Sequence, residues 1–313
     1  MVKDIKKFLN ETYNIDARSV ASVDFGVMNS NYVISTEEGD YIFRINEHKN
    51  RDEVKFEIEV LEYLDKSNFP SPRIIKSGSG VYVTNFFSKP AILYAYMPGT
   101  PMGRITTDFI RETGQMMGRF HMATEDYAPE APKSSWEPKE LLSLVEDNKQ
   151  KMIQCGFEGI EKVLHFCEQE LPKFKFPESL PKGITHQDIK PENIIVHNGA
   201  VRAFIDFDNA YYGTLLTDLS TTVIWTCFEG GRLDFSLVKS LIDGYQKERR
   251  LADEEKMFLY KAIKHRLVRE VFIGPYVTMH EPDISKERAE YFMSLYNNGL
   301  GDENGFQKKL CLI

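Results

Sequence analysis

The residues best suited to chemistry lie between Ile184 and Asn209, in the stretch ITHQDIKPENIIVHNGAVRAFIDFDN. His186, Asp188 and Asn193 follow the spacing H-x-D-x-x-x-x-N, and Asp206 comes thirteen residues after Asn193. A carboxylate can orient an attacking hydroxyl and accept its proton, while hard oxygen ligands bind Mg²⁺. We therefore predict phosphoryl transfer from a nucleotide, with Asp188 as the catalytic base and Asn193 with Asp206 as the metal ligands.

The sequence between the two predicted metal ligands supports their proximity. Two short apolar runs, 194–196 and 201–205, are joined by His197-Asn198-Gly199. An Asn-Gly pair between β-rich runs is typical of a tight hairpin. The chain would enter this hairpin at Asn193 and leave it at Asp206, which brings the two side chains together.

Length and composition limit the possible classes of protein. The 313 residues suffice for two lobes, and contents of 42% apolar and 27% charged residues are ordinary for a globular protein. The net charge of −8 and the lack of a basic tract argue against a nucleic acid partner. No apolar stretch predicts a membrane segment. We expect a cytoplasmic protein whose four cysteines are free thiols, because their spacing fits no disulfide or metal pattern: Cys155, Cys167, Cys227 and Cys311.

The N-terminal part has the pattern of a small sheet lobe. A helix over 3–14 precedes three expected strands over 20–26, 31–36 and 41–45. The turn between the first two strands lacks a glycine-rich loop. Phosphate could still be bound there by the backbone amides from Met28 to Asn31 and by the side chains of Asn29 and Ser30. A plain hairpin is the equally weighted alternative.

The third strand contains a cation in an apolar setting. Strand alternation puts Arg44 on the face opposite Phe43 and Ile45, and an unpaired charge there is costly. Glu57 on the following predicted helix is an available partner. We interpret Arg44 as the phosphate-contacting cation and Glu57 as its anchor, against the alternative of a surface salt bridge. We predict that Lys49 and Lys55 are solvent-exposed charges.

An apolar strand over 91–97 ends at Pro98-Gly99, which predicts a hinge at about 94–99. The backbone of Tyr96 and Met97 would receive the adenine edge. The expected lobes are 1–97, binding nucleotide, and 98–313, holding the catalytic and acceptor sites. Two more strands are expected over 74–75 and 81–84. Helical patterns then follow over 108–124, 138–153, 158–171, 218–225, 234–248, 253–272 and 285–297, and the tail from 299 to 313 shows no clear pattern.

The stretch His186 to Asn193 resembles the protein-kinase catalytic loop, with Lys190 as a further candidate nucleotide contact. Only twelve residues separate Asp206 from Asp218, which opens a helix, so a peptide-binding activation segment has no room. Asp206-Phe207-Asp208 replaces D-F-G, and A-P-E is absent. The layout instead resembles the aminoglycoside phosphotransferase and choline kinase superfamily. Within this superfamily the chain most resembles the homoserine kinase branch. The segments that carry this resemblance are Asn29-Ser30-Asn31-Tyr32, Leu180 to Ile184, Leu216 to Trp225 and Asp243 to Gln246.

This resemblance implies an α+β, protein-kinase-like bilobal fold. The N-terminal lobe would be an antiparallel sheet with one main helix, and the larger C-terminal lobe would be mostly helical. It also implies ATP, with GTP not excluded, and Mg²⁺ as the cofactors of a kinase for a small alcohol. Asp208 would be a second metal contact or a loop fastener. The sequence does not indicate an oligomeric state.

The predicted acceptor is a small, polar amino alcohol such as homoserine, and an aminoglycoside, choline or a sugar is the alternative. A Ser/Thr protein kinase and an inactive nucleotide-binding module are further alternatives. Acidic and aromatic side chains after the metal ligand are candidates to hold an ammonium group: Asp208, Tyr211, Tyr212, Trp225 and Glu229. A carboxylate would need Arg266 or Arg269 on the 253–272 helix. Core packing of the aromatics and a surface position of the arginines are the alternative for this set.

Overall fold

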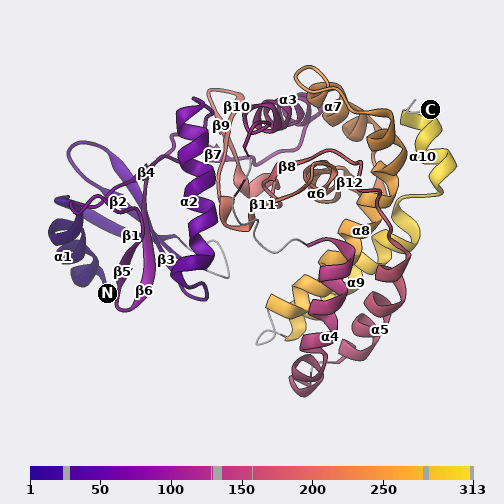
Figure 1. Cartoon of the computed structure of the whole chain (residues 1–313), viewed down its shortest axis with the longest axis horizontal. Coiled ribbons are helices and arrows are strands. Elements are labelled where there is room, and N and C mark those ends of the chain that lie inside the picture. The colour runs from indigo at the N-terminus through magenta and orange to yellow at the C-terminus, as the bar shows by residue number, and fades with distance from the viewer. Residues whose placement is uncertain (24–28, 128, 130–135, 157, 278–281, 311–313) are drawn as a thin grey trace.

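The computed structural model describes the chain except for residues 24–28, 128, 130–135, 157, 278–281 and 311–313. It folds as two lobes, a small sheet lobe at the N-terminal end and a larger helical one (Figure 1). This two-lobed, mixed α+β architecture has the sheet lobe and the helical lobe that the sequence predicts. The predicted turn residue Met28 and the predicted free thiol Cys311 lie outside the described residues.

The small lobe is built on one antiparallel sheet with the strand order β1-β2-β3-β6-β4, and β5 pairs with β6. Arg44 on β3 is opposite Asn31 on β2 and Ile92 on β6 in the register. The strands are β1 (Ser19–Val23), β2 (Asn29–Ser35), β3 (Asp40–Asn46), β4 (Ile74–Ile75), β5 (Thr84–Phe86) and β6 (Lys89–Ala95). Residues 81–83, expected to be strand, precede β5 without belonging to it.

Two helices cover opposite faces of this sheet (Figure 1). Helix α1 (Val2–Tyr13) buries Ile5 and Leu9 in one core with Phe43. Helix α2 (Arg51–Lys66) begins with a complete capping box at Asn50 and buries its apolar side in the other core. The period-two pattern of β3 therefore sets Phe43 toward α1 and Arg44 toward α2, as the alternation predicts.

The chain passes to the large lobe between Ala95, the end of β6, and β7 (Thr100–Pro101), which pairs with β9 of the large lobe. Gly99 adopts φ 137° in this crossing, and a Cβ there would lie 2.6 Å from Ile195 Cγ2 and 2.7 Å from the Val196 carbonyl oxygen. Only glycine combines this backbone conformation with so close an approach.

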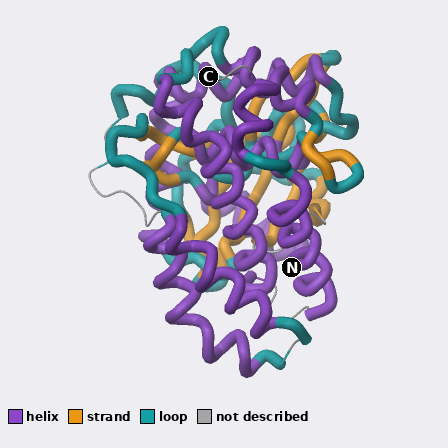
Figure 2. Tube along the Cα trace, turned by 90° about the vertical axis from the view of Figure 1, so that its right-hand side faces the viewer, coloured by secondary structure: helices purple, strands orange, loops and turns teal. Residues whose placement is uncertain are grey.

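Helices form most of the large lobe, as the view onto it in Figure 2 shows. Its helices are α3 (Thr107–Ala123), α4 (Pro138–Gln154), α5 (Ile160–Glu170), α6 (Leu216–Thr226), α7 (Phe235–Tyr245), α8 (Asp253–Val277), α9 (Pro282–Ser294) and α10 (Glu303–Leu310). The amphipathic patterns predicted the first seven of these, whereas α10 falls in the tail that showed no clear pattern. In the described part of the chain, no helix is both long and apolar enough to cross a membrane.

Two short ladders frame the catalytic stretch. Strands β9 (Ile194–His197) and β10 (Ala200–Phe204) form the predicted hairpin, and both turn residues have positive φ, 51° at Asn198 and 75° at Gly199. Strand β8 (Lys182–Thr185) pairs with β11 (Tyr211–Thr214), so the chain before His186 is tied to the chain after Asp208. The sequence patterns indicated neither β8 nor β11. A further small hairpin, β12 (Phe228–Glu229) with β13 (Arg232–Leu233), follows α6.

Candidate active site

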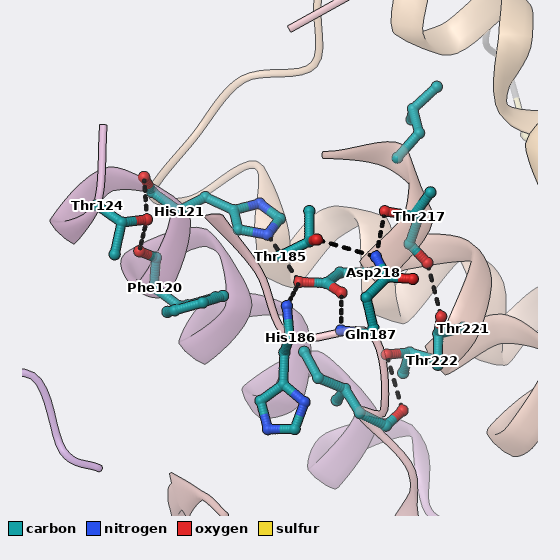
Figure 3. A network of polar contacts seen from close by, with 12 residues as sticks. Phe120, His121, Thr124, Thr185, His186, Gln187, Thr217, Asp218, Thr221 and Thr222 are labelled. Carbon is teal, nitrogen blue, oxygen red and sulfur yellow. Dashed lines mark hydrogen bonds and ion pairs between the residues drawn. The ribbon is translucent and has the colours of Figure 1, made fainter. Parts of the chain in front are cut away.

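The loop after β8 is fixed by the buried carboxylate of Asp218, near the start of α6. Its two oxygens accept the backbone N–H groups of His186 at 2.8 Å and of Gln187 at 2.7 Å (Figure 3). Gln187 holds φ 69°, a conformation unfavourable for a side chain-bearing residue. The two hydrogen bonds offset that cost and fix the backbone directly before Asp188.

Asp218 is itself held by α3. His121 Nε2 lies 3.1 Å from Asp218 Oδ2, and His121 Nδ1 lies 2.8 Å from the hydroxyl of Tyr245, which accepts from Arg249 at 2.9 Å. Burial opposes the charge of Asp218, but the contacts with His121 outweigh it and lower the pKa of this carboxyl. His121 thereby supports the catalytic loop from α3. The role of Asp218 was not predicted; its position at a helix start next to the loop was the only signal.

We expect Asp218→Asn to destabilise the fold by about 3 kcal/mol, because removing one partner of a buried charged network leaves the others uncompensated. His121 and two backbone N–H groups would lose the negative charge that they share. Urea unfolding of this variant, compared with Asp253→Asn at a carboxylate that is 93% exposed, measures the difference. Equal unfolding midpoints would contradict the supporting role.

Asp188 lies between an amide and an ammonium group. Asn193 Nδ2 donates to the Asp188 main-chain oxygen and to its Oδ2, both at 2.9 Å, and Lys190 Nζ lies 2.9 Å from Oδ2. Burial works against the charge of Lys190, but Asp188 outweighs burial and raises the lysine pKa. The structure thus brings together three of the predicted residues, with the carboxylate held in an orientation that its neighbours define.

Arg44 and Glu57 form the predicted ion pair, with Nη1 3.4 Å from Glu57 Oε1. The same guanidinium reaches the other lobe, where its Nη2 lies 2.9 Å from Asp206 Oδ1, and its Nε donates to Asn31 Oδ1 at 3.1 Å. Tyr94 donates to Glu57 Oε1 at 2.9 Å. All three guanidinium nitrogens therefore contact protein acceptors, and the pairing that the strand alternation predicted is confirmed.

The groups around Asp206 suit a divalent cation. Burial and the nearby Asp208 raise the pKa of Asp206, against the opposing effect of Arg44, so its negative charge is disfavoured without a further cation. The amide of Asn193 uses its nitrogen on Asp188, which turns its oxygen away from that residue. One carboxylate and one amide oxygen, with the remaining ligands from phosphate and water, are a normal set for Mg²⁺.

Asp208 is bound from the small lobe by two donors. Asn29 Nδ2 and Lys49 Nζ each lie 3.1 Å from Asp208 Oδ2, and Lys49 also donates to the Asp208 carbonyl oxygen at 2.6 Å. The Lys49 side chain is only 18% exposed. The prediction that Lys49 is a solvated charge is therefore wrong, because the segment between β3 and α2 faces the other lobe, whereas Lys55 is 69% exposed as expected.

Two buried arginines of α8 reach the residue next to Asp188. Arg266 Nη2 donates to the Gln187 carbonyl oxygen at 3.1 Å, and Arg269 Nη1 donates to Gln187 Oε1 at 2.9 Å, with its guanidinium over the Trp136 ring. Burial and the neighbouring Arg266 lower the pKa of Arg269 to about 9. Arg266 Nε and Nη1 and Arg269 Nε are buried without a hydrogen-bond partner among the described residues. These arginines are not surface charges.

Glu270 partly balances this positive cluster. It contacts Arg266 at 3.0 Å and Arg288 at 2.6 Å. Burial opposes the ionisation of Glu270, but Arg266 and Arg288 outweigh burial and lower its pKa to about 2. Three guanidinium groups against one carboxylate leave a net positive charge beside the catalytic loop.

The residues predicted to bind an ammonium group differ in their burial and in the partners that they already have. Trp225 lies under two protein cations, Arg288 at 5.1 Å and Lys190 at 5.8 Å from its ring centroid, which opposes a third cation there. Tyr211 is buried and belongs to β11, while Tyr212 beside it is partly exposed. Glu229 is exposed in β12, and Asp208 is engaged by Lys49.

The remaining predicted nucleotide contacts lie in the small lobe and the crossing. Tyr96 is exposed and Met97 partly buried directly after β6, where the backbone would meet a base. Ser30 at the start of β2 donates to Glu47 at 2.6 Å, so its hydroxyl is already in use.

The two-lobed α+β fold, with this loop and this arrangement of carboxylates, is that of a phosphotransferase. The chain belongs to the phosphotransferase enzyme family, whose model matches residues 19–257. It is 28% identical to the homoserine kinase of Caulobacter vibrioides (strain NA1000 / CB15N) over 262 residues, which cover 81% of this chain and 80% of that protein. It is also 25% identical to the homoserine kinase of Rhodospirillum rubrum over 94% of this chain and 91% of that one.

Solved structures with the same fold include an amicoumacin kinase in complex with AMP-PNP, Ca²⁺ and Ami, with a TM-score of 0.73 and 16% identity over 94% of this chain and 93% of that one. A microcompartment-associated aminopropanol kinase matches with a TM-score of 0.66 and 15% identity over 94% and 95% of the two chains. At such identities the likeness concerns the fold. These comparisons confirm the resemblance to the superfamily and to its homoserine kinase branch.

Proposed function

We propose that this kinase transfers the terminal phosphate of ATP, with Mg²⁺, to the hydroxyl of a small amino acid alcohol such as homoserine. The observation that carries the proposal is the position of Asp188, oriented by Asn193 and Lys190 and one residue from the contact of Arg266 and Arg269 with Gln187. Phosphoryl transfer depends on positioning and electrostatics, and this arrangement supplies both.

Each residue has a role that its contacts support. Asp188 would orient the acceptor hydroxyl and take its proton, while Lys190 balances charge near the transferred group. Asn193 and Asp206 would hold Mg²⁺, which when bound offsets the charge of the phosphates. Arg44, anchored by Glu57, would fix Asp206 across the two lobes, and the backbone of Tyr96 and Met97 would receive the base.

The positive charge beside the catalytic loop favours a carboxylate-bearing substrate. Arg266 and Arg269 keep buried N–H donors without protein partners in the described chain, and desolvated guanidinium groups bind carboxylates strongly and in two-pronged geometry. The names of the homoserine kinase relatives agree with such a substrate. Choline and aminoglycosides are cationic, so the same cluster would repel them.

A protein kinase is opposed by the chain after Asp206. The short 3₁₀ turn Phe207–Asn209 leads directly into β11, and β11 pairs with β8 before α6 begins at Leu216. This segment is tied down along its length and offers no extended platform for a peptide.

Coupled ADP release tests the proposal with homoserine, choline, a hexosamine, kanamycin and a serine-containing peptide as separate acceptors, each with ATP and with GTP. We expect turnover on homoserine alone. Turnover on kanamycin alone would overturn the amino acid substrate but leave the kinase in place, whereas phosphate transfer only to peptides would overturn the small-molecule class.

Arg269→Gln should raise the KM for homoserine about tenfold or more, because a charged hydrogen bond to the substrate carboxylate is lost. The KM for ATP should change little. Lys261→Gln, at an exposed cation on the same helix, is the matched control. An unchanged KM for homoserine would refute the carboxylate site.

A further inference from the structure

The junction of the two lobes contains a second cation besides Arg44. Lys49 lies in the segment between β3 and α2, and its amine shares the Asp208 Oδ2 atom with the side-chain amide of Asn29. Two donors of the small lobe thus meet one anionic oxygen of the large lobe. Asp208 comes two residues after the predicted metal ligand Asp206, and Asn29 begins the strand after the predicted phosphate turn.

The guanidinium group of Arg44 is held by protein contacts and cannot readily move to bind a phosphate group. Its Nε, Nη1 and Nη2 already contact Asn31, Glu57 and Asp206, and its side chain is 11% exposed. Lys49 differs in both respects. In the described part of the chain, its contacts with Asp208 use two of three N–H donors, and its flexible stem ends at the junction where the lobes face each other.

We propose that Lys49 is the residue that binds the terminal phosphates of the nucleotide, with Asp208 as its exchangeable counter-ion. A phosphate oxygen has the charge and acceptor character of the Asp208 carboxylate oxygen, so Lys49 and Asn29 can pass from one to the other. Arg44 then acts as the fixed bridge that positions Asp206. Phosphate binding would then belong to Lys49, and the positioning of Asp206 to Arg44, instead of both belonging to one cation on β3. This inference rests on the proposed function, because it assumes that the junction binds a nucleotide.

Calorimetric titration with ADP and with adenosine, each in EDTA and in Mg²⁺, tests this role. Lys49→Met should weaken ADP binding about tenfold and leave adenosine binding unchanged, since only the phosphates lose a contact. Lys49→Arg should retain most of the ADP affinity. Lys55→Met removes an equal charge from an exposed position nearby and should match the wild type.

Asp208→Asn separates phosphate binding from a simple latch between the lobes. If Lys49 binds phosphate, this variant should keep its ADP affinity in EDTA within about twofold of the wild type, because the lysine loses a competitor rather than its ligand. Equal losses in Lys49→Met and Asp208→Asn, or an unchanged ADP affinity in Lys49→Met, would overturn the inference while the kinase stands. A wild-type protein that binds neither ADP nor adenosine would overturn the inference and the proposed function together.

Discussion

Asp188→Asn should lower turnover by about 10²-fold or more while nucleotide affinity and folding stay near those of the wild type. The amide is nearly isosteric with the carboxylate, and Asn193 and Lys190 hold the residue from two sides, so the loop geometry should survive. What disappears is the ability to accept the proton of the acceptor hydroxyl at the moment when the phosphate is transferred.

The matched control for this variant is Glu192→Gln, which removes one carboxylate from an exposed position in the same loop. It should retain full turnover. Single-turnover measurement of phosphate transfer, together with ADP titration of both variants, separates the chemical step from binding. Near-normal transfer in Asp188→Asn would exclude this residue as the base, and an equal loss in Glu192→Gln would attribute the effect to loop charge alone.

Local patterns in the sequence predicted the elements that carry the site. The Asn198-Gly199 turn indicated the hairpin, because its two positive φ angles suit only a few residue types. The alternation along β3 and the position of Glu57 on the helix that follows predicted the pairing of Arg44 with Glu57. Each of these depends on residues close in sequence or on one amphipathic face, where periodicity is informative.

Contacts that depend on how the lobes meet could not be predicted in this way. Lys49 follows a strand in a polar segment, and its sequence neighbours resemble those of any solvated lysine; the partner Asp208 is far away along the chain. The support of the loop by Asp218 and His121 likewise joins two helices whose order in space no pattern defines. The strands β8 and β11 were missed because four-residue segments are too short to show alternation.

The division of charge at the lobe junction has a consequence for the metal site. Burial and the nearby Asp208 raise the pKa of Asp206, although the charge of Arg44 opposes them. An acid whose folded pKa lies above its unfolded value makes the charged form costly at neutral pH, and the fold gains stability as the pH falls through that pKa. Replacing Asp206 by a neutral residue should therefore not destabilise the protein at pH 7.

Asp206→Asn should therefore keep its stability, but it should lose activity. We expect turnover to fall by about 10²-fold or more, because the developing charge on the phosphates loses its fixed metal. The Mg²⁺ concentration at half-maximal activity should also rise at least about tenfold, since a full charge is replaced by a carbonyl dipole. Arg44 keeps Glu57 and Asn31 as partners in the variant.

Asn193→Ala, in contrast, removes a dipole and should shift the Mg²⁺ requirement less. Its amide also orients Asp188, so turnover at saturating Mg²⁺ should remain low in this variant. The measurements are Mg²⁺ titrations of activity and thermal unfolding in the absence of Mg²⁺ for both variants and for Asp108→Asn, whose carboxylate is 82% exposed. A normal Mg²⁺ requirement in Asp206→Asn would exclude it as a metal ligand. A melting temperature well below that of the wild type would instead show that its pairing with Arg44 stabilises the lobe junction more than the crowding of Asp206 and Asp208 destabilises it.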